Sequence, residues 1–369
     1  MASPDLIDIE SLLQPFTGDI PSGLDIRSDI SPTSPYQMLR SQREQARAVE
    51  RQSVHDGNSN EASEHWRQVA EISPGIFRDK SKDLEVACWY AEAMVRRNGF
   101  AGLRDSFRLI EGLIDRFWDT LFPIPDEYGI ETRVTCLAGL CGDGGLEGSL
   151  IAPIRKVTIT EGDYPGPFSF WQYHQANDAE NTIDERSRKN KIENLGFSLK
   201  DIDKSVDGST QDFFVNQRSD LSECIDCYRS ISTKLDNLCG LEDAPPTRKI
   251  IEVLDECLLA VNFIGKQKFP VAAEENEDIE ESSDTIDSPE ATKTNTRGPV
   301  ATRDDAFKQL LLIADFFRKT EPHSPVSYIL QKAVKWGNMP LTELISELID
   351  NDDSRRRYSE LTGVEEENT

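Results

Sequence analysis

A strongly acidic segment divides this 369-residue chain and limits how it can fold. Residues 274–290 hold nine carboxylates, no basic residue and only two isoleucines. A segment with so much like charge and so little apolar surface cannot offset the entropy cost of becoming ordered. The sequence therefore predicts a flexible acidic linker over residues 270–300, with a folded part on each side of it.

The part before the linker shows helical periodicity. Two apolar stripes with spacings of three and four residues lie on either side of Asn98-Gly99. The stripes consist of Leu84, Ala87, Cys88, Ala91 and Val95, and of Leu103, Phe107, Ile110, Ile114, Phe117 and Leu121. We predict two adjacent helices, and the second must end before Pro123 and Pro125 because proline cannot continue a helix.

A further pair of stripes flanks Pro245-Pro246 and predicts a helical hairpin. They consist of Leu221, Cys224, Tyr228, Ile231, Leu235 and Leu238, and of Ile250, Val253, Cys257, Val261 and Ile264. Strand-forming residues are few, since only residues 154–160 combine β-branched side chains with partial alternation. The predicted fold class is all-α, with at most one short β element.

Signals for helix ends are clear after the linker. Thr302 begins a helix that Pro322 ends, and Ser324-Pro325 begins a second helix that Gly337 closes. Pro340 opens a third helix. Residues 301–369 are thus predicted to form a small module of three to four helices.

This module is predicted to self-associate, because its helices carry wide apolar stripes. A small domain without disulfide or metal is marginal alone, and apolar surface beyond what it can cover usually marks an interface. A monomeric three-helix bundle is the alternative. The residues expected to build the interface or its turns are Phe317, Glu321, Pro322, His323, Ser324, Pro325, Val326, Leu330, Val334, Trp336, Pro340, Leu341 and Leu344.

Charge and composition exclude several partners. The chain has 41 basic and 67 acidic residues, for a formal charge of -26, which repels nucleic acid and anionic lipid. No run approaches the ~20 apolar residues that span a bilayer, and the first residues lack a basic and then apolar leader. The seven cysteines are odd in number and scattered, which indicates reduced thiols. We expect a cytoplasmic protein without direct membrane insertion.

Motifs for catalysis or cofactors are weak. The glycine-rich run 139–148 lacks the Lys-Ser/Thr that a phosphate-binding loop needs. Cys224 and Cys227 form a C-x-x-C, yet no second pair of thiols or imidazoles accompanies them. We expect no cofactor, no metal and no enzymatic activity. A thiol- or zinc-dependent enzyme using these two cysteines and Cys257 is the alternative left open.

Four segments carry distinctive motifs. After the linker lies the run FRKTEPHSPVSYILQKAVKWGNMPLTELISELI, and before it lie residues 22–40, 81–127 and 150–160. The run after the linker resembles the C-terminal signature of the TssA (ImpA-type) family of bacterial type VI secretion, in its short form. The segments before the linker resemble the ImpA N-terminal domain of that family, whose motif falls here on Gly23, Leu24, Asp25, Arg27, Trp118, Leu121 and Pro123. On an irregular segment, we expect Asp25 and Arg27 to fasten the N-terminal strap to the helical body or to contact a partner.

The resemblance implies an assembly subunit that associates with the baseplate, inner tube and sheath, and whose C-terminal part forms a ring. The expected organisation is an ImpA-type domain over residues 1–175, a helical hairpin extension over 176–269, the linker over 270–300 and the oligomerisation module over 301–369. A generic helical adaptor unrelated to secretion is a second alternative. The number of subunits in the ring does not follow from the resemblance.

Overall fold

The computed structural model describes residues 2–56, 60–142, 145–162, 164–240, 242–269, 303–320, 325–337 and 339. These residues form thirteen α-helices and two short 3-10 helices, and their only β interactions are four isolated bridges. The prediction of an all-α fold is confirmed. Among the described helices, none combines the length and the apolar character that crossing a membrane requires.

The helices fall into two compact units, Met1–Glu275 and Asn276–Thr369. The first holds α1 (Ile9–Leu12), α2 (Pro35–Asp56), α3 (Asn60–Asp79), α4 (Leu84–Phe117), α5 (Glu131–Cys141), α6 (Ile151–Lys156), α7 (Phe170–Glu180), α8 (Glu185–Leu195), α9 (Leu199–Gly208), α10 (Gln211–Cys239) and α11 (Arg248–Ile264), with 3-10 turns at Ile26–Ser28 and Lys266–Lys268. The second holds α12 (Arg303–Thr320) and α13 (Val326–Gly337). The expected boundary between residues 175 and 176 falls inside α7, and the predicted linker lies outside the described residues.

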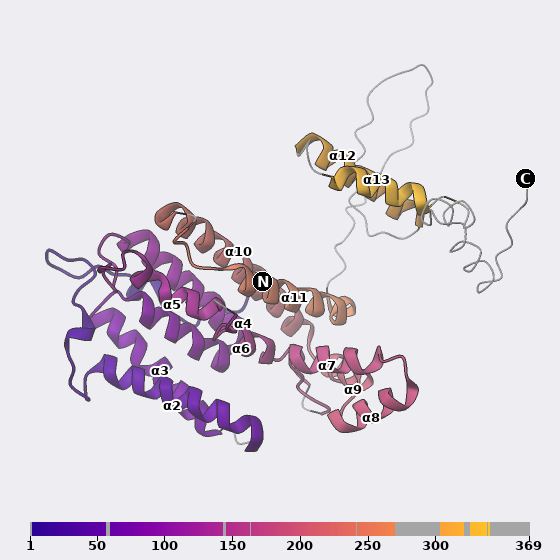
Figure 1. Ribbon diagram of the computed structural model, residues 1–369. Helices are drawn as coiled ribbons and strands as arrows, with labels where there is room; N and C mark the ends of the chain where they lie inside the picture. The colour runs from indigo at the N-terminus through magenta and orange to yellow at the C-terminus, as the bar shows by residue number, and fades with distance from the viewer. Residues whose placement is uncertain are drawn as a thin grey trace, which may run out of the picture. The chain divides into compact units, whose positions relative to one another are not determined.

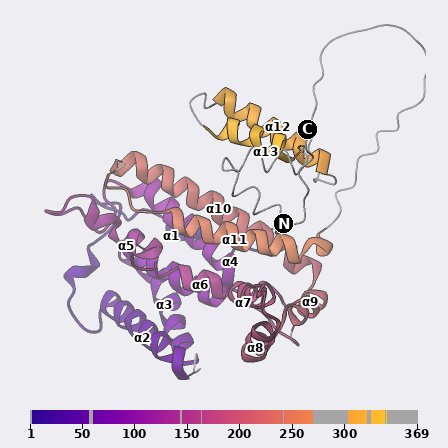
Figure 2. The same cartoon turned by 45° about the vertical axis from the view of Figure 1, so that its right-hand side comes forward.

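Helix α4 is the centre of the N-terminal unit. The pair α2–α3 lies on one side of it and the hairpin α10–α11 on the other, as Figures 1 and 2 show. Every residue of the two predicted stripes around Asn98-Gly99 is buried in the core. The Asp83 carboxylate begins this helix by accepting a hydrogen bond from the Val86 N–H at 3.1 Å.

Gly99 breaks α4 where the sequence predicts a break. Its backbone has φ 57° and ψ -140°, a conformation that L side chains rarely adopt, so two straight segments meet at a kink. The second segment ends at Phe117, before Pro123. The two predicted helices are therefore confirmed as the two halves of one kinked element.

The predicted hairpin is confirmed as α10 and α11, with one exception in its stripes. Leu238 is 44% exposed, because the last turn of α10 extends beyond the surface that α11 covers. The run 154–160, in which the sequence allowed at most one short β element, begins inside α6. Ile154 is buried in α6, and the only β interaction in this run is the bridge between Thr158 and Ser169. Packing of Ile154 in the core outweighs the weak β propensity of this run.

Helices α7, α8 and α9 form a small cluster at one end of the N-terminal unit (Figure 1). Side-chain hydrogen bonds begin all three: Ser169 and Gln172 form a capping box on α7, Ser198 and Asp201 form one on α9, and Asp184 caps α8. The buried Ser205 hydroxyl donates to Thr160 Oγ1 at 2.8 Å, which joins α9 to the segment after α6.

The C-terminal unit is described by one antiparallel helix pair. Arg303 at the start of α12 donates to the Gly337 carbonyl at the end of α13, and Arg318 near the end of α12 donates to Gln331 Oε1 at 2.6 Å. The helices begin and end close to the predicted signals. The predicted third helix from Pro340 lies outside the described residues.

Candidate interaction surfaces

An N-terminal strap, residues 20–30, crosses the loop between α3 and α4. The Lys82 N–H donates to the Ser22 carbonyl at 2.8 Å, and the Leu24 N–H donates to the Lys80 carbonyl at 3.0 Å. Gly23 lies between these bonds with φ +82°, and a Cβ at this position would be 2.3 Å from the Lys80 carbonyl oxygen. Glycine is thus required here by both backbone conformation and space.

Arg27 fastens the strap to the start of α4. Its guanidinium donates to Asp83 at 2.5 and 3.2 Å and to Glu85 at 2.6 Å. The Asp83 side chain is fully buried, and burial raises its pKa although the Arg27 charge opposes the shift. Asp25 bonds only within the strap, where its carboxylate accepts from the Arg27 N–H at 3.0 Å.

Lys82 sits beneath the strap and is fully buried. Its ammonium donates to the carbonyls of Leu12 and Phe77, both at 2.6 Å, and lies 4.6 Å from the ring centroid of Phe16. A buried charge is tolerated only when it is bonded in this way. The Lys82 carbonyl in turn accepts from the Phe122 N–H at 3.1 Å, so one residue links the strap, the α3 end and the segment after α4.

The second half of the family motif lies after α4. Leu121 is buried, whereas Trp118 is half-buried and packs under the guanidinium of Arg133, which lies 5.1 Å from its ring centroid. Arg133 also donates to the carbonyls of Trp118 at 2.6 Å and Pro123 at 3.1 Å. These motif residues therefore close the α4–α5 connection, and the bonds described for them are within the N-terminal unit.

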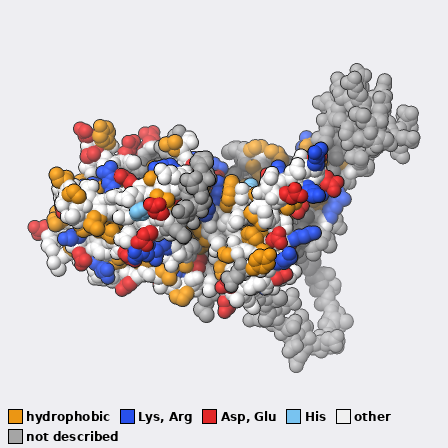
Figure 3. All heavy atoms as spheres, turned by 90° about the horizontal axis from the view of Figure 1, so that it is seen from below, with side chains coloured by type: hydrophobic (Ala, Val, Ile, Leu, Met, Phe, Trp, Pro, Cys, Tyr) orange, Lys and Arg blue, Asp and Glu red, His pale blue; other side chains and the backbone are white. Residues whose placement is uncertain are grey.

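Apolar side chains are exposed on both segments of this junction. Leu24 and Ile30 of the strap and Tyr128 after α4 are more than two-thirds exposed. On the face of the molecule that Figure 3 shows, apolar side chains are interspersed with charged ones. A role of the strap in contacting a partner stays a prediction.

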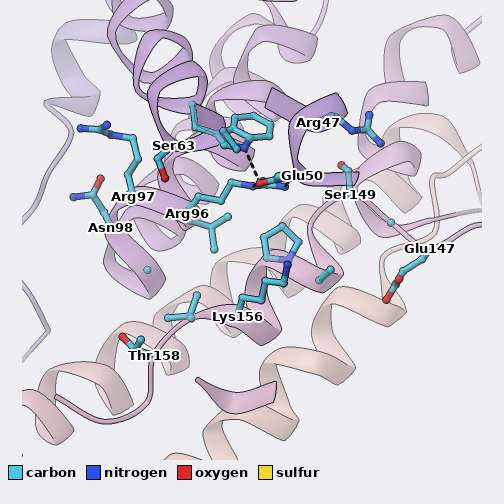
Figure 4. A pocket seen from close by; sticks show the side chains of 18 of the residues that line it. Arg47, Glu50, Ser63, Arg96, Arg97, Asn98, Glu147, Ser149, Lys156 and Thr158 are labelled. Atoms are coloured by element: carbon cyan, nitrogen blue, oxygen red, sulfur yellow. Dashed lines mark hydrogen bonds and ion pairs between the residues drawn. The ribbon is translucent and has the colours of Figure 1, made fainter. Parts of the chain in front are cut away.

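A groove with a volume of about 920 Å³ lies at the kink of α4, bounded by residues of α2, α3, α6 and α10. Its floor is apolar and includes the buried side chains of Trp66, Val95 and Val157. One wall carries an ion pair between Arg96 on α4 and Glu50 on α2 (Figure 4).

Both side chains of this ion pair make several further contacts. Arg96 donates to both carboxylate oxygens of Glu50, at 2.7 and 3.0 Å, and to the Glu92 carbonyl at 2.7 Å. Its guanidinium also lies 4.0 Å from the ring centroid of Trp66, whose Nε1–H donates to Glu50 at 2.8 Å. The pair therefore contributes rigidity to the groove and no excess charge.

Four other cations line the groove and have no carboxylate partner among the described residues: Arg47, Arg51, Arg97 and Lys156. Arg47 is half-buried, and its pKa is lowered by burial and by the positive charges of Arg43, Arg51 and Arg96, against the attraction of Glu92. The other three cations are exposed. Glu147, the remaining acid of the lining, lies 3.5 Å from Arg155. The groove thus has a positive charge excess within a chain of formal charge -26.

Sequence reasoning missed this groove and the buried charges of the strap junction. A signal for the groove was present in α2, where Arg43, Arg47 and Arg51 recur every four residues and so share one helix face. For Lys82 and Asp83 the signal was a charged pair directly before an apolar stripe.

The cysteines of the C-x-x-C lie in the core. The Cys224 thiol is buried 3.5 Å from the Phe100 carbonyl, and the Cys227 thiol donates to Glu111 at 3.3 Å. Burial raises the pKa of both thiols, and Cys257 is affected in the same way. Because the thiolate is the nucleophile and the metal ligand, these environments disfavour both roles. Among the described residues, no group of three or more His, Cys, Asp or Glu side chains is placed to hold a metal.

The predicted interface residues of the C-terminal unit are only partly described. Val334 is buried between α12 and α13, while Phe317, Leu330 and Trp336 are half-buried and Pro325 and Val326 are exposed. The other predicted residues, Glu321, Pro322, His323, Ser324, Pro340, Leu341 and Leu344, lie outside the described residues. Their part in self-association stays a prediction.

Comparison with known proteins adds three findings. A family model described as "ImpA, N-terminal, type VI secretion system" matches residues 13–142. The "Type VI secretion system component TssA1" of Pseudomonas aeruginosa is 22% identical over 375 residues, which cover 98% of this chain and all of that protein. A solved structure, the "N-terminal domain including the conserved ImpA_N region of the TssA component of the type VI secretion system from Burkholderia cenocepacia", has a TM-score of 0.57 at 22% identity, covering 72% of this chain and 96% of that one.

Residues 13–142 match an ImpA-type N-terminal domain, within an all-helical fold. The chain is TssA-like, and its predicted resemblance to TssA of type VI secretion is confirmed. Both similar proteins named above are described as components of a type VI secretion system.

Proposed function

We propose that this chain is a non-enzymatic assembly subunit of a type VI secretion system. In this proposal its C-terminal unit self-associates into a ring, and its N-terminal unit contacts baseplate, inner tube and sheath proteins in the cytoplasm. The match to TssA1 along nearly the whole chain supports a place in that machine. The proposal does not specify how many subunits form the ring.

The observation that carries self-association is the exposed apolar surface of the helix pair α12–α13. Leu312 and Ile313 of α12 are 47% and 45% exposed, and Tyr328 and Ile329 of α13 are 60% and 62% exposed. A pair of short helices with this much apolar surface gains free energy when a second copy covers it. A module as small as residues 301–369 is marginal on its own, so the free energy gained by association matters more to it.

Avidity is the mechanism that a ring would supply. Several N-terminal units on one ring act at a high effective concentration, so contacts that are weak singly become strong together. This mechanism needs no catalytic residue. It agrees with the buried thiols of Cys224 and Cys227, whose raised pKa values disfavour the alternative of a thiol enzyme.

The test compares the full chain with a chain ending at residue 299 and with the double variant Leu312→Glu/Ile329→Glu. Light scattering coupled to size exclusion should give an oligomer for the full chain and a monomer for the other two. Ile183→Glu, which changes a fully exposed isoleucine of the N-terminal unit, is the matched control and should stay oligomeric. A monomeric full chain at tens of micromolar, or an oligomeric truncated chain, would refute the assignment.

A further inference from the structure

The groove at the kink of α4 has the size and the lining of a ligand-binding site. Its walls come from α2, α3, α4 and the end of α6, so its shape depends on helices that the core fixes. Its lining combines an apolar floor with cations around it, which is the composition of a site that recognises a charged ligand carrying some apolar surface.

The positive charges of the groove indicate a negatively charged ligand. Arg96 is neutralised by Glu50, whereas Arg47, Arg51, Arg97 and Lys156 have no carboxylate partner in the described part of the chain. Placing Arg47 beside other arginines without such a partner costs free energy that an incoming carboxylate would recover. Guanidinium groups bind carboxylates through paired hydrogen bonds, and three of these four cations are arginines.

The spacing of the cations indicates a ligand with several negative groups. They are distributed over α2, the kink of α4 and the end of α6, and Figure 4 shows Arg47 and Arg97 apart from one another with Lys156 below the Arg96–Glu50 pair. A single small anion cannot reach all of them, whereas a chain bearing several carboxylates can. The formal charge of -26 repels a long polyanion such as nucleic acid, but a short segment interacts mainly with the charges within a Debye length, roughly 10 Å.

We propose that this groove binds a carboxylate-rich segment of a partner protein, whose carboxylates pair with Arg47, Arg51, Arg97 and Lys156. Among the described residues, the Gln217 Oε1 has no hydrogen-bond partner and is an acceptor for an N–H group of such a segment, while its Nε2 donates to the Thr158 carbonyl at 3.3 Å. The proposal rests on the proposed function in one respect, that the N-terminal unit contacts partner proteins.

The experiment measures binding of a fluorescent 12-residue peptide, rich in glutamate and containing two leucines, to the full chain by anisotropy at low salt. A second peptide has glutamine in place of each glutamate. We expect the acidic peptide to bind the native chain, and its affinity to fall at least tenfold in Arg47→Gln/Arg97→Gln and at 0.3 M salt. The glutamine peptide should bind at least tenfold more weakly.

The matched control is Arg186→Gln/Arg188→Gln, which removes the same charge from α8, outside the groove. It should bind the acidic peptide within twofold of the native chain. Equal weakening in the two double variants would show only general attraction and would overturn the groove assignment, as would absence of binding to the native chain. Equal or tighter binding of inorganic phosphate or a short single-stranded oligonucleotide, in competition with the peptide, would replace the protein segment by a phosphate ligand.

Neither arginine of the test variant makes an ion pair with a described residue, so we expect neither double variant to melt at a lower temperature than the native chain. The outcome is separable from that of the self-association test. A chain that is oligomeric but does not bind the acidic peptide refutes the groove alone, and a monomeric chain that binds it refutes the scaffold alone.

Discussion

At the scale of single residues, the N-terminal unit is notable for its buried charges. Asp83, Glu92 and Arg104 are all buried, and each has an ion partner distant in sequence or on a neighbouring helix. Such pairs need not stabilise the fold relative to apolar residues, but losing one partner leaves the other uncompensated. They therefore fix which segments lie together.

Replacing Arg27 by alanine should destabilise the N-terminal unit by about 3 kcal/mol, because the fully buried Asp83 carboxylate would lose its cation. Urea unfolding of the variant and the native chain gives the difference. Arg248→Ala, which removes an exposed pair with Glu252, is the control and should cost less than about 1 kcal/mol. Equal effects of the two substitutions would show that the strap junction does not depend on Arg27.

The pair of Glu92 with Arg43 predicts a pH dependence. Burial raises the pKa of Glu92, but the hydrogen bonds and charge of Arg43 outweigh burial and hold it below its ordinary value. A carboxyl whose pKa is lower in the folded state contributes stability above the unfolded value of about 4.3, and that stability is lost as the pH falls further.

The free energy of unfolding of Glu92→Gln should thus be lower than that of the native chain by about 3 kcal/mol at pH 7. The difference should stay constant down to about pH 5 and shrink below about pH 4, as measured by urea unfolding at each pH. For Glu44→Gln, which removes an exposed pair with Arg40, we expect less than about 1 kcal/mol throughout. A difference that grew on acidification would contradict the assigned direction.

At the scale of helices, Gly99 determines the course of α4. It holds a positive φ at the kink, and a Cβ there would lie 3.1 Å from Val157 Cγ1. Gly99→Ala should therefore destabilise the unit by about 1–3 kcal/mol, measured by thermal or urea unfolding. Gly139→Ala is the contrasting variant. It lies within α5 with open space around its Cβ position, and alanine should leave stability unchanged or raise it by up to about 1 kcal/mol.

The kink also positions the groove, since Arg97, Asn98 and Gly99 all line it. A straight helix would turn these residues relative to Glu50 and Trp66. If Gly99→Ala folds, we expect its affinity for the acidic peptide to be reduced even though no cation is removed. Unchanged stability and affinity would show that the kink is not needed at this position.

At the scale of the whole molecule, the core of the N-terminal unit is complete within its own residues. Its principal cluster of buried side chains runs from Ile7 to Val261. A chain ending at residue 299 should therefore keep the unfolding transition of the N-terminal unit, with a midpoint shift of less than about 2 °C in calorimetry. Loss of that transition, or a shift of many degrees, would show that the unit requires the C-terminal residues for its stability.

The sequence by itself determined the class of fold and the positions of several long helices, although it did not locate α2 or α3. Apolar spacing, proline and glycine are local signals, and they located the two halves of α4, the hairpin α10–α11 and the pair α12–α13. They did not identify Leu238 as exposed, because this residue lies beyond the start of the partner helix α11.

Only the tertiary structure decided which charges meet. Arg27 bonds to Asp83, 56 residues away, and the groove joins Arg47, Arg97 and Lys156 from three helices. A charged residue on a helix surface has the same local pattern whether water or a distant segment lies opposite, so spacing along the chain cannot tell these cases apart. The pairing is fixed by how the helices pack around α4, which no local signal contains.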